Sequence, residues 1–160
     1  AEPFRSIIDP DYGEFFAGGD NVTKIQEYCR KTSQPVPETV GQVARCIYES
    51  LALKYRWALE RLEEIKGEKI DTLNIVGGGI NNKLLNQMAA DSIDRKVITG
   101  PVEGAAIGNL LSQAMALGAI RDIDDLRRVV RNSEEVNEYQ PNHTSEWDAA
   151  YAQLLKLMED

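Results

Sequence analysis

The sequence contains a single histidine, His143, and only two cysteines, Cys29 and Cys46. One imidazole and two thiols at these positions do not match any zinc-binding spacing, so a zinc centre is excluded. Two cysteines in 160 residues also exclude the disulfide-rich class of small secreted domains. We expect both to be buried as small apolar side chains. They fall on neighbouring predicted helices, so a disulfide between them remains open.

Positive charge is scarce as well. The chain has 18 lysines and arginines against 26 acidic residues, a net charge of −8. Without a basic stripe it has nothing to neutralise phosphates, so nonspecific nucleic acid binding and binding to anionic membranes are not expected. No apolar run approaches the length that spans a bilayer. No signal peptide is visible, and the expected location is therefore cytoplasmic.

The remaining composition is that of an ordinary globular protein. Hydrophobic residues make up 42% of the chain, and 160 residues suffice for one domain with a core. We therefore expect residues 1–160 to form a single domain. The chain begins at Ala1 rather than Met, which reads as a piece of a longer polypeptide.

Hydrophobic periodicity predicts an α/β domain in which a sheet is flanked by several helices. The predicted strands are 72–76 and 96–99, with a short strand at 5–8 and another within 133–142. The predicted helices are 21–32, a long one at about 37–66, 81–91, 101–117, 124–131 and 145–158. The long helix is expected to begin at Pro37, which suits a first helical turn, and to end at Gly67.

The most informative feature is the strand-like run Leu-Asn-Ile-Val at 73–76, which ends in Gly77, Gly78 and Gly79. Three glycines are costly in chain entropy, so they are expected where the backbone turns sharply or another molecule comes close. At a strand-to-helix junction that molecule is an anion, because free N–H groups and the helix dipole favour negative charge. The alternative is a tight turn with close packing. A P-loop is excluded because no Gly-Lys-Ser/Thr follows, and Asn82 replaces the third glycine of a dinucleotide motif.

Amide side chains surround this turn. Asn81 and Asn82 stand at the first turn of the predicted helix, where an amide can either contact a nucleotide or cap the helix. We expect one of the two to be the cap. Gln87 is expected to make internal hydrogen bonds. The small residues of Gly104–Gly108 are expected to let a helix pack closely on the sheet.

Taken in order, these segments resemble the C-terminal domain of the FGGY carbohydrate kinases, which have a two-domain, actin-like (ribonuclease H-like) ATPase fold. The matching pieces are QVARCIYE at 42–49, VGGG at 76–79, Gln87, Ala90-Asp91 and EGAA at 103–106. Cys46 departs from the alanine or serine that the family has there. Within the family the chain is most similar to the rhamnulokinase subgroup, on FRSIIDPD at 4–11, QPVPET at 34–39, ESLALKYR at 49–56, GPVE at 100–103 and Gly108-Asn109.

The resemblance implies transfer of the γ-phosphate of ATP to the 1-hydroxyl of L-rhamnulose, with Mg²⁺. It implies that Gly77, Gly78, Gly79 and Asn82 hold the nucleotide. It also implies a partner, the N-terminal kinase domain of the same protein, which carries the catalytic base and most of the sugar site. We therefore assign no catalytic residue and no metal ligand within this chain, and expect that it is inactive alone. Asp91 and Glu103 are interpreted as structural.

Three alternatives remain. The chain resembles other FGGY sugar kinases too, so the sugar rests on the subgroup motifs alone. A helical interaction module with an incidental glycine turn would use the long helix as a partner surface. A sugar-responsive repressor of the same fold normally carries a DNA-binding segment, and nothing in this chain is basic enough for one.

Overall fold

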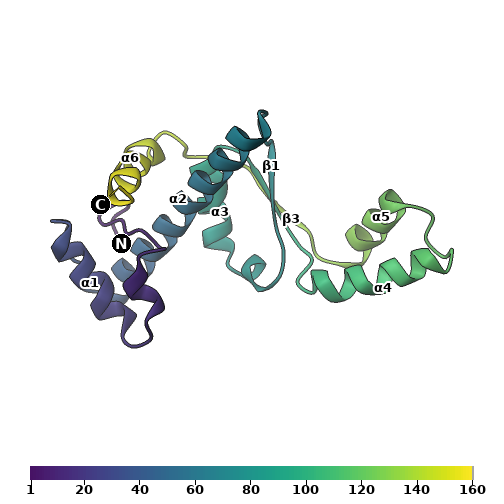
Figure 1. The fold of residues 1–160 in the computed structure, drawn as a ribbon, viewed down its shortest axis with the longest axis horizontal. Coiled ribbons are helices and arrows are strands. Elements are labelled where there is room, and N and C mark those ends of the chain that lie inside the picture. Colours follow the sequence, from purple (N-terminus) through teal and green to yellow (C-terminus); the bar gives the residue numbers. More distant parts are fainter. Residues whose placement is uncertain (160) are drawn as a thin grey trace.

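The computed structural model describes residues 1–159, and Figure 1 shows how its helices and strands are arranged. The strands are β1 (Thr72–Ile75), β2 (Lys96–Thr99) and β3 (Asn137–Tyr139). The helices are α1 (Asn21–Lys31), α2 (Val40–Lys66), α3 (Lys83–Ile93), α4 (Gly104–Ala116), α5 (Ile123–Ser133) and α6 (Trp147–Leu157). Two short 3₁₀ turns, η1 (Gly13–Phe16) and η2 (Gly78–Asn81), complete the described chain. The predicted α/β class is confirmed.

The sheet has the order β1-β2-β3, with β1 and β2 parallel and β2 and β3 antiparallel. Leu73, Val97 and Tyr139 lie side by side across the three strands. This row belongs to the face that packs on α3 and α2, where Leu59, Ala89, Ala90 and Ile93 complete a buried cluster. The opposite face, with Asn74 and Ile98, lines an open groove toward α5. The sheet is therefore covered by helices on one side.

The long predicted helix is confirmed as α2, but it begins at Val40 rather than at Pro37. Thr39 accepts a hydrogen bond from the Gln42 N–H, and the Gln42 side chain accepts from the Thr39 N–H, which together form a capping box. This reciprocal cap places the helix start after the proline. Gly67, with a φ of 75°, ends the helix as predicted.

The predicted strand at 5–8 is wrong. The backbone N–H groups of this segment donate to side chains instead of to a neighbouring strand. The Ile7 N–H donates to Gln34 Oε1 at 2.8 Å, and the Ile8 N–H donates to Ser50 Oγ at 3.0 Å. Because each donor is already satisfied, the segment lies as an irregular buried chain along α2.

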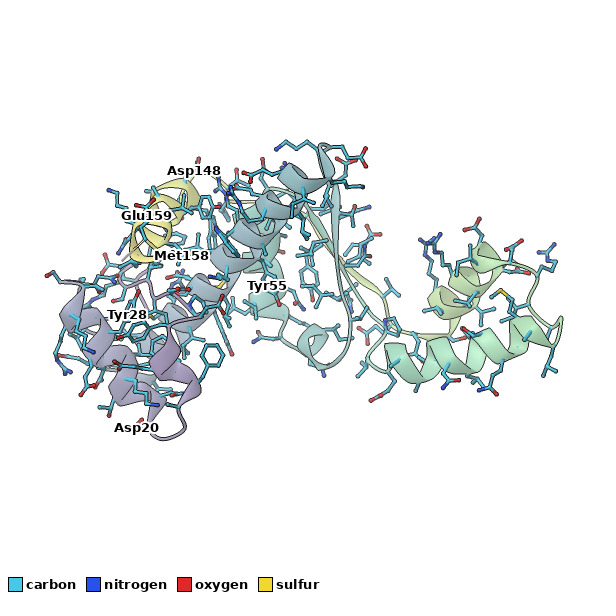
Figure 2. The ribbon with its side chains drawn as sticks, viewed as in Figure 1. Asp20, Tyr28, Tyr55, Asp148, Met158 and Glu159 are labelled. Atoms are coloured by element: carbon cyan, nitrogen blue, oxygen red, sulfur yellow. The ribbon has the colours of Figure 1, made fainter. Side chains whose placement is uncertain are left out.

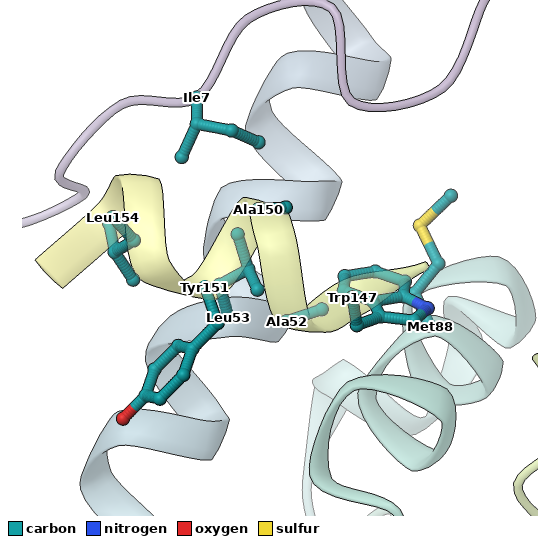
Figure 3. Packing of buried hydrophobic residues seen from close by; sticks show 8 residues of the cluster. All are labelled: Ile7, Ala52, Leu53, Met88, Trp147, Ala150, Tyr151 and Leu154. Atoms are coloured by element: carbon teal, nitrogen blue, oxygen red, sulfur yellow. The ribbon is translucent and has the colours of Figure 1, made fainter. Parts of the chain in front are cut away.

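The segment also carries the ring of Phe4 into the core between α2 and α6. Figure 3 shows Ile7 above α6 and the aromatic residues of α6 pointing toward α2 and α3. Trp147, Tyr151 and Leu154 form the buried face of α6, whereas Leu155 is 36% exposed. An ion pair between Arg56 and Asp148, 2.8 Å from Nη1 to Oδ1, joins the start of α6 to α2; Figure 2 labels Asp148.

Helices α4 and α5 extend away from the rest of the described chain (Figure 1). The predicted helix after β2 is confirmed, and Gly118 with a φ of 77° follows its end. The expected packing of this helix on the sheet is wrong, because α4 packs against α5. Of the small residues 104–108, Gly104 lies against Val76, which directly follows β1. Across the described residues, no helix combines the length and apolar content that crossing a bilayer requires.

Candidate functional site

The glycine turn lies where two parallel strands end. Both β1 and β2 run in the same direction, so the loops that follow them lie at the same edge of the sheet. Two backbone hydrogen bonds join the loops: Gly77 N–H donates to Pro101 O at 3.1 Å, and Gly100 N–H donates to Ile75 O at 3.0 Å. The carboxyl ends of parallel strands are the usual ligand-binding edge of an α/β sheet.

Gly77 is required by backbone conformation. Its φ of 81° and ψ of −163° lie in a region that is essentially restricted to glycine. A Cβ there would meet no atom closer than the Val102 carbonyl oxygen, at 3.9 Å. The constraint on Gly77 is therefore the turn itself, and not a lack of space.

Gly78 and Gly79 have a different character. They open the 3₁₀ turn η2, both are exposed, and neither has a positive φ. A Cβ on Gly78 would meet nothing within 4 Å. Within residues 1–159 neither N–H group has a hydrogen-bond acceptor. Two adjacent free donors on an unobstructed backbone suit an anion or another close-lying ligand group.

Asn82 is the residue that caps α3. Its Oδ1 accepts a hydrogen bond from the Leu85 N–H at 3.1 Å, which confirms the expectation that one of the two asparagines is a cap. The Nδ2 group of Asn82 is the part of the side chain left for a ligand, and it can only donate. Asn81 is exposed beside it at the end of η2.

Asn86 holds the turn in place, and sequence reasoning missed it. Its side chain is 1% exposed, and its Nδ2 donates to the Ile80 carbonyl oxygen at 2.9 Å. This bond ties the end of the glycine turn to the second turn of α3. The signal was available in principle, because a polar residue on the buried side of a helix needs an internal partner.

Gln87 and Asp91 are structural, as expected. Gln87 Nε2 donates to Asp91 Oδ1 and to the Gln140 carbonyl oxygen, both at 2.8 Å. Asp91, 8% exposed, also accepts from the Asn142 N–H at 2.9 Å. The bonds to Gln140 and from Asn142 attach the chain that leaves β3 to α3, and the Gln87–Asp91 bond within α3 orients the two side chains. Glu103, in contrast, is exposed and makes no side-chain capping bond to α4.

The loop after β2 is a second part of the site that the sequence predictions did not include. A Cβ built on Gly104 would lie 3.8 Å from the side chain of Val76 and 3.8 Å from that of Pro101. The start of α4 therefore lies directly against the start of the glycine turn. The two N-terminal turns, of η2 and of α4, open onto the same edge of the sheet.

This arrangement offers hydrogen-bond donors to a ligand. No cluster of three or more His, Cys, Asp or Glu side chains that could bind a metal exists within the described residues. The turn offers the backbone N–H donors of Gly78 and Gly79, the side-chain amide of Asn82 and an unobstructed backbone. Such a site can position an anionic ligand such as a nucleotide.

Comparison with known proteins agrees with this picture. A model described as the FGGY family of carbohydrate kinases, C-terminal domain, matches residues 1–117. A rhamnulokinase of Bacteroides thetaiotaomicron is 47% identical over 150 residues, which are 94% of this chain. A rhamnulokinase of Enterococcus faecalis is 45% identical over 141 residues, or 87% of this chain. The chain spans only 31% and 28% of these two relatives.

Solved structures share the fold at low identity. A xylulose kinase from Rhodospirillum rubrum gives a TM-score of 0.63 at 22% identity, over 78% of this chain and 25% of that one. A ligand-bound xylulose kinase from Lactobacillus acidophilus gives 0.60 at 14% identity, over 79% of this chain and 26% of the other. A gluconate kinase from the same organism gives a TM-score of 0.59 at 16% identity, over 74% of this chain and 24% of that one.

Proposed function

Because the chain belongs to the FGGY family of carbohydrate kinases, we propose that it is the nucleotide-binding part of a rhamnulokinase. In this proposal residues 1–160 form one domain, the C-terminal half of a two-domain kinase. The observation that carries the proposal is the glycine turn. Its two free N–H groups and open backbone lie at the carboxyl edge of parallel strands, in a chain that matches ATP-dependent sugar kinases.

The site residues have distinct roles in the proposal. Gly78 and Gly79 donate backbone hydrogen bonds to ATP or ADP, Gly77 makes the turn that presents them, and Asn82 donates from Nδ2. The N-terminal turn of α3, which follows η2 directly in the chain, carries partial positive charge that favours a phosphate. Asn86 is a positioning residue, because it holds the turn through the Ile80 carbonyl.

The whole enzyme transfers the γ-phosphate of ATP to the 1-hydroxyl of L-rhamnulose. In the proposal Mg²⁺ accompanies the ATP phosphates and is held together with the N-terminal domain. Phosphoryl transfer depends chiefly on positioning and charge stabilisation, so a domain without a catalytic base still has a full role. Closure of two domains over a cleft excludes water and aligns sugar with ATP.

The choice of sugar rests on the relatives. The two relatives described above are rhamnulokinases at 45% and 47% identity, whereas the xylulose and gluconate kinases share 22% identity or less and support the fold alone. A cytoplasmic location, where ATP is abundant, belongs to the same proposal. A different FGGY sugar kinase is the second candidate, and an acceptor panel with the full-length enzyme separates the two.

Calorimetry against ADP tests nucleotide binding. We expect weak binding to the 160-residue chain and a loss of heat in Gly78→Asp, because a carboxylate at the open backbone position repels the phosphates. Gly41→Asp is the matched control: Gly41 lies in the first turn of α2, and a Cβ there also meets nothing within 4 Å. Equal heats from Gly78→Asp and Gly41→Asp would remove the glycine turn from the site. A helical interaction module without a nucleotide site would show no heat in any of the three proteins.

Sugar phosphorylation tests the division of labour. We expect no phosphorylation of L-rhamnulose by the 160-residue chain and robust activity from the full-length kinase. Turnover by the short chain would place a catalytic base within it and refute the proposed division.

A further inference from the structure

A groove separates the open face of the sheet from α5, and we call it the α5 groove. Figure 1 shows α2 and α3 on one side of the strands and α5 on the other. All three strands and α5 contribute residues to its lining. Its volume of about 530 Å³ is typical of cavities that hold small organic ligands. Neither the glycines of the turn nor Asn82 line it, so it is distinct from the candidate nucleotide site.

Positive charge gathers in this groove, although the whole chain has a net charge of −8. The lining includes Lys96 of β2 and, four residues apart on one side of α5, Arg127 and Arg131. The only carboxylate that lines the groove within the described chain is Glu138. Arg127 is paired with Asp124 at 3.3 Å, whereas neither Lys96 nor Arg131 has an ion-pair partner within residues 1–159. Basic side chains without counter-ions on two walls of a groove favour an anionic ligand.

The floor of the groove suits a ligand that also carries hydroxyl groups. Pairing across the sheet sets Asn74, Ile98 and Glu138 side by side, one from each strand. An apolar side chain therefore lies between an amide and a carboxylate. Both polar groups are exposed, and they accept hydrogen bonds from hydroxyl groups, while Ile98 offers a surface for C–H groups. A sugar presents hydroxyl and C–H groups together.

We propose that the α5 groove is a second ligand site, which binds a phosphorylated sugar. The phosphate lies at Lys96, Arg127 and Arg131, and the sugar hydroxyl groups lie at Asn74 and Glu138. The Glu138 carboxylate gives the site its selectivity, because it repels a free phosphate and accepts hydrogen bonds from a ligand that brings hydroxyl groups. The site goes beyond the proposed nucleotide site and does not depend on it.

Calorimetry on the full-length kinase tests the groove, with saturating ADP present throughout. The probes are D-glucose 6-phosphate, inorganic phosphate and D-glucose. We expect glucose 6-phosphate to bind most tightly and glucose to give no heat. Arg131→Gln should weaken binding of glucose 6-phosphate at least about tenfold, because a charge-assisted hydrogen bond is lost. Arg128→Gln is the matched control on the same helix and should keep the affinity, since Arg128 pairs with Asp125 and does not line the groove.

Glu138→Ala distinguishes a phosphorylated sugar from a free phosphate. The substitution removes both an acceptor for hydroxyl groups and a charge that repels phosphate. Glucose 6-phosphate should bind less tightly to this variant, because a hydrogen bond to a charged acceptor outweighs a repulsion that solvent and salt screen. Inorganic phosphate should bind at least as tightly to the variant as to the wild type.

Two results would overturn the inference. If glucose 6-phosphate binds equally to the wild type and Arg131→Gln, or binds to neither, the groove is not a site. If Glu138→Ala binds both phosphate probes more tightly, the ligand is not a phosphorylated sugar. Phosphorylation of L-rhamnulose by the same proteins is a separate readout: an inactive wild type refutes the proposed function alone, and an active wild type that binds no glucose 6-phosphate refutes the second site alone.

Discussion

The adjacent glycines 77 and 78 are predicted to respond in opposite ways to the same substitution. Gly77→Ala forces a Cβ into a φ of 81° and ψ of −163°, a region essentially closed to other residues. Such strain costs about 1–3 kcal/mol of folding stability. At about 2–4 °C per kcal/mol for a chain of this size, the melting temperature falls measurably.

Gly78→Ala carries no such strain. Gly78 has no positive φ, and its added Cβ meets nothing within 4 Å. Removing the freedom of a glycine from the unfolded chain should therefore stabilise the protein by about 0.4–1 kcal/mol. The same methyl group, however, occupies the space in which ADP approaches the backbone.

Nucleotide binding separates the two variants. At an ADP concentration of 100 times Kd, binding stabilises the wild-type chain by about 2.7 kcal/mol. We expect Gly78→Ala to weaken binding about tenfold, which reduces that stabilisation to about 1.4 kcal/mol at the same concentration. Gly41→Ala, at another unobstructed helical glycine, should keep the full ADP effect. Urea unfolding with and without ADP gives all of these values.

Either of two outcomes would refute this reasoning. If Gly77→Ala unfolds like the wild type, the left-handed turn is not a constraint. If Gly78→Ala keeps the full stabilisation by ADP, the open backbone at Gly78 is not where the nucleotide lies.

Three further predictions concern the surrounding structure. Asn86→Ala leaves the Ile80 carbonyl without its buried donor and should cost about 1–3 kcal/mol in urea unfolding; a loss below about 0.5 kcal/mol would contradict the anchoring role. Hydrogen bonds, first from the Ile70 N–H and then from Lys69, hold the pKa of the Glu63 carboxyl below its usual value. The stabilisation by the ionised Glu63 carboxylate is therefore present above the unfolded pKa and is lost as the pH falls through the folded pKa. The variant Glu63→Gln should accordingly be less stable than the wild type at pH 7 and nearly as stable as the wild type at acid pH. Urea unfolding at the two pH values measures this difference. Cys29 and Cys46 are free and buried, so thiol titration should find two reactive thiols after unfolding and none before it. If no thiol reacts even in the unfolded chain, the two cysteines form a disulfide.

Local sequence signals predicted the elements well. The strands at Thr72–Ile75 and Lys96–Thr99 and the cap at Gly67 follow from periodicity and glycine placement, which act between near neighbours. Asn82 as a cap is equally local. The start of α2 was wrong by three residues because the capping box of Thr39 and Gln42 outweighs the preference for proline in a first turn.

The predictions that failed concern partners far apart in the sequence. The backbone at Ile7 and Ile8 looked extended and apolar, as a strand is, but side chains 27 and 42 residues away satisfy its N–H groups. The small residues of α4 were expected to pack on the sheet, but after β2 the chain leads α4 away from the sheet and α4 packs against α5. A polar residue at a buried helical position signals some internal partner, but only the fold identifies the partner of Asn86 as the Ile80 carbonyl oxygen.

The sequence alone determined the α/β class, the glycine turn between a strand and a helix, and the resemblance to the FGGY kinases, because these depend on residue order over short spans. Only the tertiary structure decided how the three glycines differ. It gave Gly77 a conformation closed to other residues and left the backbone of Gly78 open and unpaired. It also placed the loop after β2 against the turn, because parallel strands bring distant loops to one edge of a sheet.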